Sequence, residues 1–508
     1  MSGTKRTGRA GFSPLAAMVF ACVIILASPA YSLTRYVTNL DDSGPGSLRD
    51  TVAAALSLDI VDCTGISGEI LLTTGQIGIS DKSITIIGPG AKNLAISGNN
   101  SSRIFSISGV SFSVTISGIT LKDGHAKGTD GAAGAPSGGG FPGLGGAIYV
   151  EATVSGSFQM LNCAVLGNVA EGGTGGEGTG EAGGGGGGAG MGGGLYFADN
   201  VTATVEGCLI SGNQALGGMG GFMHAAGGAG AGLGGGLFNE SSQVDLINCT
   251  IANNSAQGGA GQSESTGYTP YLDSGSAGLW GQGGQGNGGG GNGGFGGGGG
   301  GGAPIWGQGG NGGYGGGGGL GESVGLGGDS GGNAMSGVSS GGGAGMGGGL
   351  FTYMSGSTYL LNCTVSGNIT IRGLDANGET GSAAGTGKGG GAVEQGVSST
   401  TVKNTIIHGN QAPDSGPDVY GQFISWGYNH VTNTVDSTGW GGMDTNTFDP
   451  MLMPLADNGG PTLTMALDEY SSMVNTGDDS FAPATDQRGF PRPMGLASDK
   501  GAYEFDFP

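Results

Sequence analysis

Positively charged residues are scarce in this chain of 508 residues. Lysine and arginine together number 16, against 38 aspartate and glutamate residues, so the formal net charge is -22. A protein that binds nucleic acid through a basic face needs clustered lysine and arginine to contact phosphates. The composition therefore excludes that class of partner.

Proline is also scarce, at 17 residues, and no continuous Gly-X-Y period runs through the 126 glycines. Collagen needs both features, so a collagen-like fibre is excluded. Motifs for common chemistries are missing too. Neither the HExxH zinc motif nor a phosphate-binding P-loop occurs, and the four histidines stand singly. The sequence therefore assigns no catalytic residue, no metal site and no cofactor.

The first 32 residues have the order of a secretory signal peptide. Lys5, Arg6 and Arg9 precede an apolar run at 15–26, and small residues follow as far as Ser32. The run is shorter than the roughly 20 residues that span a bilayer. We expect cleavage after Ser32 and a secreted or cell-surface protein. No later run is long and apolar enough to span a membrane.

A repeated phrase dominates the rest of the chain. Four copies contain cysteine and end in asparagine, and a fifth has Asn404 in place of cysteine: residues 161–168, 206–213, 247–254, 361–368 and 403–410. A Gly-Gly-aliphatic phrase precedes each copy, at residues 145–149, 193–196, 235–238, 348–351 and 390–393. Apolar residues alternate within the copies, which predicts short strands that end at Asn-Gly turns.

Like side chains that recur at the same phase favour coils stacked in register, which is a parallel β-helix of the all-β class. Val165, Ile210 and their equivalents then face inward, and the cysteines two places earlier do the same. We expect Cys163, Cys208, Cys249 and Cys363 to form a buried ladder of free thiols. With Cys63 the exported chain has five cysteines, an odd number that cannot all pair. The terminal asparagines are expected to form a turn ladder.

The expected organisation places an N-terminal cap at 33–65, a β-helix at 66–412 and a C-terminal capping module at 413–508. In the first cap, Ser47 and Asp50 have helix-capping spacing, and Leu48, Val52 and Leu56 would share the face that covers the first coil. In the last module, we expect Trp426, Trp440 and Phe448 in the core and ion pairs among Asp486, Arg488, Arg492 and Asp499.

Glycine-rich inserts leave the coils after the asparagine turn, at about 171–190, 216–232, 256–349 and 373–389. They return at the Gly-Gly phrase, so they are long loops from one corner of successive coils. Few apolar side chains are available to order them, so flexibility is expected. Trp280, Phe295, Trp306 and Tyr314 either pin these loops to the rod or form a sticky surface for sugars or apolar partners.

One group of residues is a candidate ligand-binding site. Glu151, Asp199 and Glu240 follow the Gly-Gly phrase at nearly equal offsets, beside Tyr149 and Tyr196 of an aromatic ladder. Neighbouring carboxylates could bind or cleave polysaccharide, and they could hold Ca²⁺. The alternative is a solvated acidic edge with ordinary stacking between coils.

Both ends of the exported chain resemble known families. Residues 42–49, 84–90, 96–99 and 103–105 are similar to the start of bacterial right-handed parallel β-helix surface proteins, and the repeat phrases resemble those of polymorphic outer-membrane proteins. Residues 457–461, 486–492 and 500–504 resemble the C-terminal module of choice-of-anchor Q proteins. The resemblance implies a right-handed parallel β-helix, export and a surface location. It carries no catalytic residues.

The sequence favours a secreted or cell-surface, non-enzymatic protein that is adhesin-like or structural in an envelope or matrix. Its expected partners are extracellular polysaccharide, matrix or the surface of a host or neighbouring cell. The alternative is a polysaccharide lyase or glycoside hydrolase that uses the acidic edge.

Overall fold

The computed structural model describes residues 3, 32–179, 182–222, 225–263, 278, 282–285, 289–302, 307–321, 323–335, 339–376, 378–381 and 383–506. The expected signal peptide, apart from residues 3 and 32, lies outside this part of the chain, as do Trp280, Trp306 and His224.

The N-terminal cap contains β1 (Thr34–Tyr36), α1 (Leu48–Ala54) and β2 (Ile60–Asp62). The Ser47 hydroxyl accepts the Asp50 N–H and so caps the helix, while Leu48 and Val52 are buried. The chain turns extended at Ala55, so Leu56 lies outside the helix and is 69% exposed. Placing Leu56 on the buried face was therefore wrong. Within the described residues no helix is long and apolar enough to cross a membrane.

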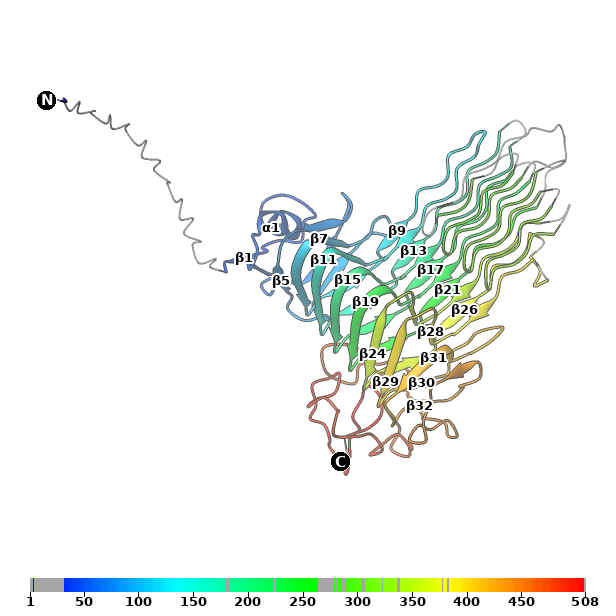
Figure 1. The fold of residues 1–508 in the computed structure, drawn as a ribbon. Helices are drawn as coiled ribbons and strands as arrows, with labels where there is room; N and C mark the ends of the chain where they lie inside the picture. The colour runs from blue at the N-terminus through cyan, green and yellow to red at the C-terminus, as the bar shows by residue number, and fades with distance from the viewer. Residues whose placement is uncertain are drawn as a thin grey trace.

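Four sheets of parallel strands form the rod, which is drawn from blue to yellow in Figure 1. The first sheet has fourteen strands, which are β1, β2, β4 (Ile77–Ser80), β5 (Ile84–Ile87), β7 (Phe105–Ser117), β11 (Ile148–Leu161), β15 (Leu195–Glu206), β19 (Leu237–Ile247), β23 (Leu350–Thr352), β24 (Ser357–Leu361), β28 (Ala392–Glu394), β29 (Ser399–Lys403), β31 (Val419–Ser425) and β33 (Ser437–Thr438). The second has nine, which are β3 (Gly68–Leu71), β6 (Leu94–Ser97), β8 (Thr120–Lys122), β12 (Ala164–Leu166), β16 (Leu209–Ser211), β20 (Thr250–Ala252), β25 (Thr364–Ser366), β30 (Ile406–His408) and β32 (His430–Val431).

The other two sheets are short and lie where the glycine-rich segments begin and end. The third sheet contains β9 (His125–Lys127), β13 (Val169–Glu171), β17 (Gln214–Leu216), β21 (Ser255–Gln257) and β26 (Ile369–Ile371). The fourth contains β10 (Gly143–Leu144), β14 (Gly190–Met191), β18 (Gly232–Leu233), β22 (Gly345–Met346) and β27 (Gly387–Lys388).

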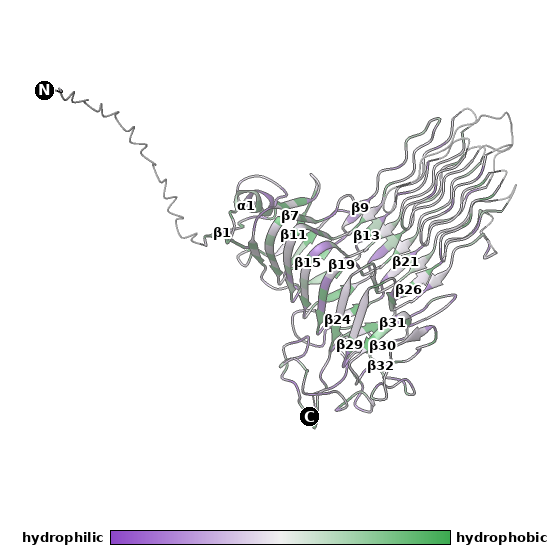
Figure 2. Cartoon of the chain, viewed as in Figure 1, coloured by the Kyte–Doolittle hydropathy of each residue, from purple (hydrophilic) through white to green (hydrophobic). Residues whose placement is uncertain are grey.

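Equivalent residues of successive coils pair with one another, as the repeat predicted. Val165 pairs with Ile210, and Ile251 lies between Ile210 and Val365 in the same parallel ladder. All four side chains are buried. The fold is therefore a parallel β-helix, and the predicted fold class is confirmed. Figure 2 shows the apolar residues concentrated on the strands of the rod.

The cysteines and asparagines form two internal ladders. Cys163, Cys208, Cys249 and Cys363 are buried and free, and the Cys163 N–H donates to the Cys208 sulfur at 3.3 Å. The predicted thiol ladder is confirmed. The asparagine ladder consists of Asn168, Asn213, Asn254, Asn368 and Asn410, each bonded to the amide oxygen of the next or, at the end, to Asp418. These bonds satisfy buried polar groups at every turn.

The glycine-rich segments form a wing on one side of the rod (Figure 1). They leave from β9, β13, β17, β21 and β26 and return at β10, β14, β18, β22 and β27. One excursion, residues 128–142, was not predicted. Among the described residues of the wing, the glycines are largely buried and the backbone groups bond to neighbouring segments, so this part of the wing is ordered.

The bonds in the wing repeat every third residue. The N–H groups of Gly296, Gly299 and Gly302 donate to one neighbouring segment, at Tyr314, Gly317 and Leu320. Those of Gly298 and Gly301 donate to a second neighbour, at Gly187 and Gly184. A polyproline II helix has three residues per turn and no hydrogen bonds within its own segment, and these wing segments follow that pattern.

Only glycine allows this packing. A Cβ atom on Gly298 would lie 1.9 Å from the Gly228 carbonyl oxygen, and one on Gly299 equally close to that of Gly310. The expectation that little would order these segments does not hold for the described residues, because it counted side chains alone. The core of the wing consists of backbone atoms in close contact, held by hydrogen bonds between neighbouring segments of the chain.

The C-terminal module follows β30 and then runs back along the second sheet. Lys92 pairs with Asp457 at 2.6 Å, and Gln487 accepts the hydroxyl of Thr250. Trp440 packs on Phe423 at 5.2 Å between ring centroids, as expected of a core residue. Trp426 and Phe448 are 54% and 63% exposed, so their predicted place in the core was wrong.

Two buried ion pairs hold the end of this module. Arg488 pairs with Asp486 at 2.8 Å, whereas Arg492 pairs with Glu504 at 3.1 Å. Asp499, expected in an ion pair, accepts the backbone N–H groups of two other residues, Asn475 and Phe505.

Candidate functional site

An aromatic column runs along the outside of the first sheet. Each coil contributes one ring, from the residue that directly follows the aliphatic residue of the Gly-Gly-aliphatic phrase. Its members are Tyr149, Tyr196, Phe238 and Phe351, with neighbouring ring centroids 5.5, 5.2 and 5.3 Å apart. The parallel register puts these side chains one above another. The predicted aromatic ladder is therefore present.

The wing covers this column. Phe295 stacks on Tyr314 at 5.2 Å, and these two rings meet Phe238 and Phe351 edge-on at 6.4 Å. Tyr196, Phe238 and Phe351 are at most 1% exposed. Phe295 and Tyr314 thus pin the wing to the rod, which was one of the two interpretations of these residues. The middle of the column offers no open face to a sugar.

The tyrosine hydroxyls of the column reach the acidic residues. Tyr149 donates to Glu151 at 2.9 Å, and Tyr196 donates to Glu240 at 2.5 Å. Burial raises the pKa of Glu240, the Tyr196 hydrogen bond opposes this, and the charges of Asp199 and Glu151 add to the rise. Burial likewise raises the pKa of Tyr149.

The three acidic residues are neighbours but do not form one ladder. Val150 pairs with Phe197, which pairs with Asn239, so Glu151 and Glu240 share a column with Ala198 between them. Asp199 stands one residue further along. Within the described ranges, no group of three His, Cys, Asp or Glu side chains is arranged to hold a metal ion. The trio therefore gives no support to a Ca²⁺ site.

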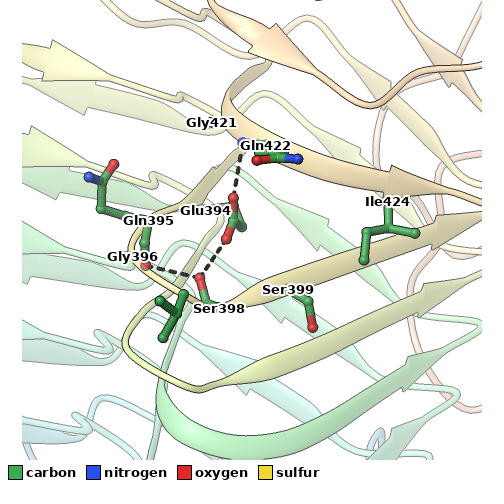
Figure 3. A pocket seen from close by; sticks show the side chains of 9 residues that line it. Glu394, Gln395, Gly396, Ser398, Ser399, Gly421, Gln422 and Ile424 are labelled. Carbon is green, nitrogen blue, oxygen red and sulfur yellow. Dashed lines mark hydrogen bonds between the residues drawn. The ribbon is translucent and has the colours of Figure 1, made fainter.

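A cavity of about 390 Å³ lies further along the same rod, where sequence reasoning placed nothing (Figure 3). It is lined by Glu394, Gln395, Gly396, Val397, Ser398, Ser399, Gly421, Gln422 and Ile424. Glu394 is 5% exposed and accepts the Ser398 hydroxyl at 2.7 Å and the Gln422 N–H at 2.9 Å. Burial raises the pKa of this carboxyl.

One feature of the sequence could have indicated this cavity, namely an acidic residue at a position that faces inward. Glu394 occupies the inward-facing position that Thr352 and Asn239 occupy in earlier coils. A carboxylate at such a position needs donors, because an unpaired buried charge is costly. Ser398 and the backbone of β31 supply them.

Beside the cavity lies an exposed group that we call the C-terminal aromatic patch, made of Tyr359, Ile424, Trp426 and Phe481. Trp426 lies 5.3 Å from Tyr359 and 6.2 Å from Phe481, measured between ring centroids. Trp426 and Phe481 are 54% and 55% exposed. Burial raises the pKa of Tyr359 to about 12.

The outer face of the wing is a third surface. Successive segments bond side by side, so that Glu171, Leu216, Gln257 and Ile371 form one row and Thr174, Met219 and Leu374 form the next. Met219 is 47% and Leu374 is 37% exposed. One cavity, of about 270 Å³, lies between these rows on a floor of glycine. A second cavity, of about 400 Å³, is lined by Ile371, Arg372, Leu374 and Pro413 among others. The face is thus ridged.

Two segments of the wing have the Gly-X-Ser-X-Gly spacing of a serine nucleophile, at 328–332 and 337–341, which sequence reasoning missed. Ser330 and Ser339 have buried hydroxyls. The described histidines bond elsewhere: His125 to Glu171, and the other two to threonines of the C-terminal module, Thr432 and Thr445. Neither serine therefore has a base beside it among the described histidines.

Comparison with known proteins does not identify a family for this chain. No protein-family model matches the chain, and no curated protein matches it. Among solved structures, the chain is similar to the crystal structure of pectate lyase Pel9A. The likeness covers 93% of this chain and 97% of that one, at 12% sequence identity and a TM-score of 0.37.

Proposed function

We propose that the chain is a secreted, non-enzymatic β-helical protein of a bacterial cell surface or matrix, whose wing makes adhesive contact. The resemblance to choice-of-anchor Q proteins and to polymorphic outer-membrane protein repeats supports this location. The net charge of -22 keeps copies apart and favours a contact role over dense self-association.

The observation that carries the proposal is the construction of the wing. Its interior is glycine backbone, and its outer face carries a side chain at every third residue, as at Leu216, Met219 and Phe222. Met219 and Phe222 are 47% and 40% exposed. A rigid array of exposed apolar side chains suits binding, since little conformational entropy is lost on contact.

The aromatic column supports a structural role for the residues beneath the wing. Its central rings are buried, and the hydroxyls of Tyr149 and Tyr196 are occupied by Glu151 and Glu240. These groups stabilise the attachment of the wing.

The wing can be tested by changing its outer face alone. We expect the triple variant Met219→Gly, Phe222→Gly and Leu374→Gly to keep the fold, because glycine fits every position of this backbone. Beads coated with the variant should lose adhesion to matrix or cells of the producing organism. A control changes Val154 and Phe448, which are exposed on the rod and the C-terminal module, to alanine.

Unchanged adhesion of the triple variant, with the control also unchanged, would contradict the proposal. A second variant removes residues 261–340 and joins Ala260 to Gly341 by a short turn. This keeps the bonded pair Gly259 and Gly343. Because it uncovers the aromatic column, its folding should be checked by circular dichroism before adhesion is measured.

A second candidate is a polysaccharide lyase or hydrolase that uses the acidic edge. The favouring observation is Glu240, a partly buried carboxyl with a raised pKa beside Asp199 and Glu151. The test measures release of reducing ends or unsaturated sugars from pectins, alginates and capsular polysaccharides, with and without Ca²⁺. Activity that Glu240→Gln abolishes would replace the adhesive proposal.

A further inference from the structure

We infer that the C-terminal aromatic patch and the cavity around Glu394 together form a binding site for a neutral saccharide chain. The site lies on the rod and does not depend on the wing. It would give the protein a second, chemically selective contact with a polysaccharide.

The aromatic rings supply the first element of such a site. Trp426 and Phe481 are each more than half exposed, although large aromatic side chains are usually among the more buried residues. Tyr359 and Phe481 both contact Trp426, with their ring planes tilted against it by 53° and 54°. Exposed aromatic faces in a cluster provide flat apolar area against which the C–H faces of sugar rings can pack.

Lys403 holds this cluster in place from beneath. Its ammonium group donates to the Trp426 carbonyl oxygen at 2.9 Å and to the Asp478 carboxylate at 2.7 Å. It also lies 5.3 Å from the Phe481 ring centroid and 4.6 Å from that of Tyr428. Lys403 thus joins the backbone at Trp426 to Asp478 and packs against the Phe481 ring. This part of the site is ordered before a ligand arrives, which reduces the entropy lost on binding.

The cavity supplies polar groups next to the rings. Ile424 belongs to both surfaces, and Trp426 follows two residues later, so about 7 Å of extended chain separates the two. Gln395, Ser399 and Gln422 line the cavity with amides and a hydroxyl (Figure 3). Amides and hydroxyls both donate and accept, as hydrogen bonding to sugar hydroxyls requires.

Charge selects a neutral chain over an anionic one. Lys403, which contacts the rings, is only 2% exposed and already paired with Asp478. Lys388, near the other side of the cavity, donates to the Tyr420 hydroxyl and lies over the Tyr420 ring. The one carboxylate of the cavity, Glu394, accepts two hydrogen bonds. With a net charge of -22, the molecule repels an acidic polymer, and no free cation lines the cavity to offset this.

The size of the site indicates a short stretch of polymer. A volume of about 390 Å³ is at the lower end of ligand pockets, which hold roughly 300 to 1,000 Å³. The open patch beside it extends the contact area along the rod. We therefore expect a few sugar units in contact, one near Trp426 and the next near Gln422.

Affinity electrophoresis tests the inference with the full chain. Native gels contain a soluble glucan, galactomannan or xylan, or the anionic polymer alginate. We expect at least one neutral polymer to retard the protein, and Trp426→Ala to weaken that retardation roughly tenfold or more. The matched control is Tyr470→Ala, which removes an aromatic ring that is 78% exposed on the same module.

Three results would overturn the inference: no retardation by any neutral polymer, retardation by alginate alone, or retardation that Trp426→Ala leaves unchanged. Gln422→Ala gives a second reading, because it removes a polar group without touching the rings and should weaken binding as well. The Met219, Phe222 and Leu374 triple glycine variant should be retarded like the parent protein. Its behaviour separates failure of this site from failure of the wing.

Discussion

The rings of Tyr196 and Phe238 lie almost parallel, with centroids 5.2 Å apart and an interplanar angle of 5°. They belong to successive coils, and both are buried although they stand on the outside of the first sheet. The wing supplies the cover, through Phe295 and Tyr314. The aromatic column is thus a second hydrophobic core that joins the rod to the wing.

Replacing Phe238 with alanine should destabilise this junction strongly. The ring contacts Tyr196, Phe351 and Phe295, so its loss leaves a cavity between rod and wing. We expect a loss of about 3 to 5 kcal/mol in the free energy of unfolding, measured by chemical denaturation. The exposed Phe481→Ala should cost much less, about 0.5 kcal/mol. Equal effects of the two substitutions would contradict a structural role for the column.

Gly298→Ala should disrupt the packing of the wing. The added Cβ would meet the Gly228 carbonyl oxygen at 1.9 Å, and backbone cannot move away as a flexible side chain can. We expect the free energy of unfolding to fall by about 1 to 3 kcal/mol or more. Neighbouring amides of the wing should lose protection from hydrogen exchange. Gly442→Ala is the control, because its Cβ would meet nothing within 4 Å. Protection that survives Gly298→Ala would show that the wing is looser than described.

The sequence predicted the rod well because recurring side chains indicate which residues of successive coils lie over one another. Cys163 and Cys208, or Asn168 and Asn213, recur at fixed offsets, and stacking them in parallel coils satisfies both the apolar core and the buried amides. The N-terminal helix was also placed, although Leu56 was assigned to the wrong side because the helix ends at Ala54.

The inserts were predicted as loops from one corner of the coils, but their internal order was not, because glycine carries no side-chain pattern. This order lies in backbone hydrogen bonds, whose period of three shows only where other residues interrupt the glycines, as at 171–177 and 216–222. Those Gly-Gly-X triplets were the available signal. Polyproline II geometry follows from them, since one residue in three then points outward.

The C-terminal aromatic patch could not be predicted from spacing. Tyr359 lies in β24, Trp426 directly follows β31, and Phe481 lies in a returning loop, so only tertiary contacts bring them together. By contrast, Tyr149 and Tyr196 were found because they occupy one place in the repeat.

The buried thiols should be unreactive until the protein unfolds. All five described cysteines are 0% exposed, so a reagent cannot reach them in the folded protein. Burial raises the pKa of Cys63 to about 12 and also raises that of Cys208 and Cys363. For Cys163 and Cys249, burial is outweighed by hydrogen bonds within the ladder, which lower the pKa. We expect an aromatic disulfide reagent to label none of the five described cysteines in the native protein and all five in denaturant. Fewer than five after denaturation without reductant, or a mass lower by two hydrogens per pair, would reveal disulfides and contradict the ladder.

Titration of Asp499 should lower the stability of the C-terminal module as the pH rises from about 4 to about 7. His430, whose pKa burial lowers to about 4, acts in the opposite direction over part of this range. Burial raises the pKa of Asp499 from 3.8 to about 7, and the charge of Glu504 adds to the rise, while backbone N–H groups and Arg492 oppose it. The folded state therefore binds a proton that the unfolded state has released, and its stability is greatest below the unfolded pKa. The loss is at most about 4 kcal/mol, since each pKa unit corresponds to about 1.4 kcal/mol.

Comparing unfolding midpoints at pH 5 and pH 8 measures this effect, and Asp499→Asn should flatten the difference. The variant is expected to be less stable than the parent at pH 5, because an amide replaces one acceptor of the Asn475 and Phe505 N–H bonds. It should lose little more on going to pH 8. Glu469→Gln, an exposed carboxyl on the same module, should keep the parent slope. A parent protein whose stability rises between pH 5 and pH 8, with Asp499→Asn following it, would show that Asp499 does not control this transition.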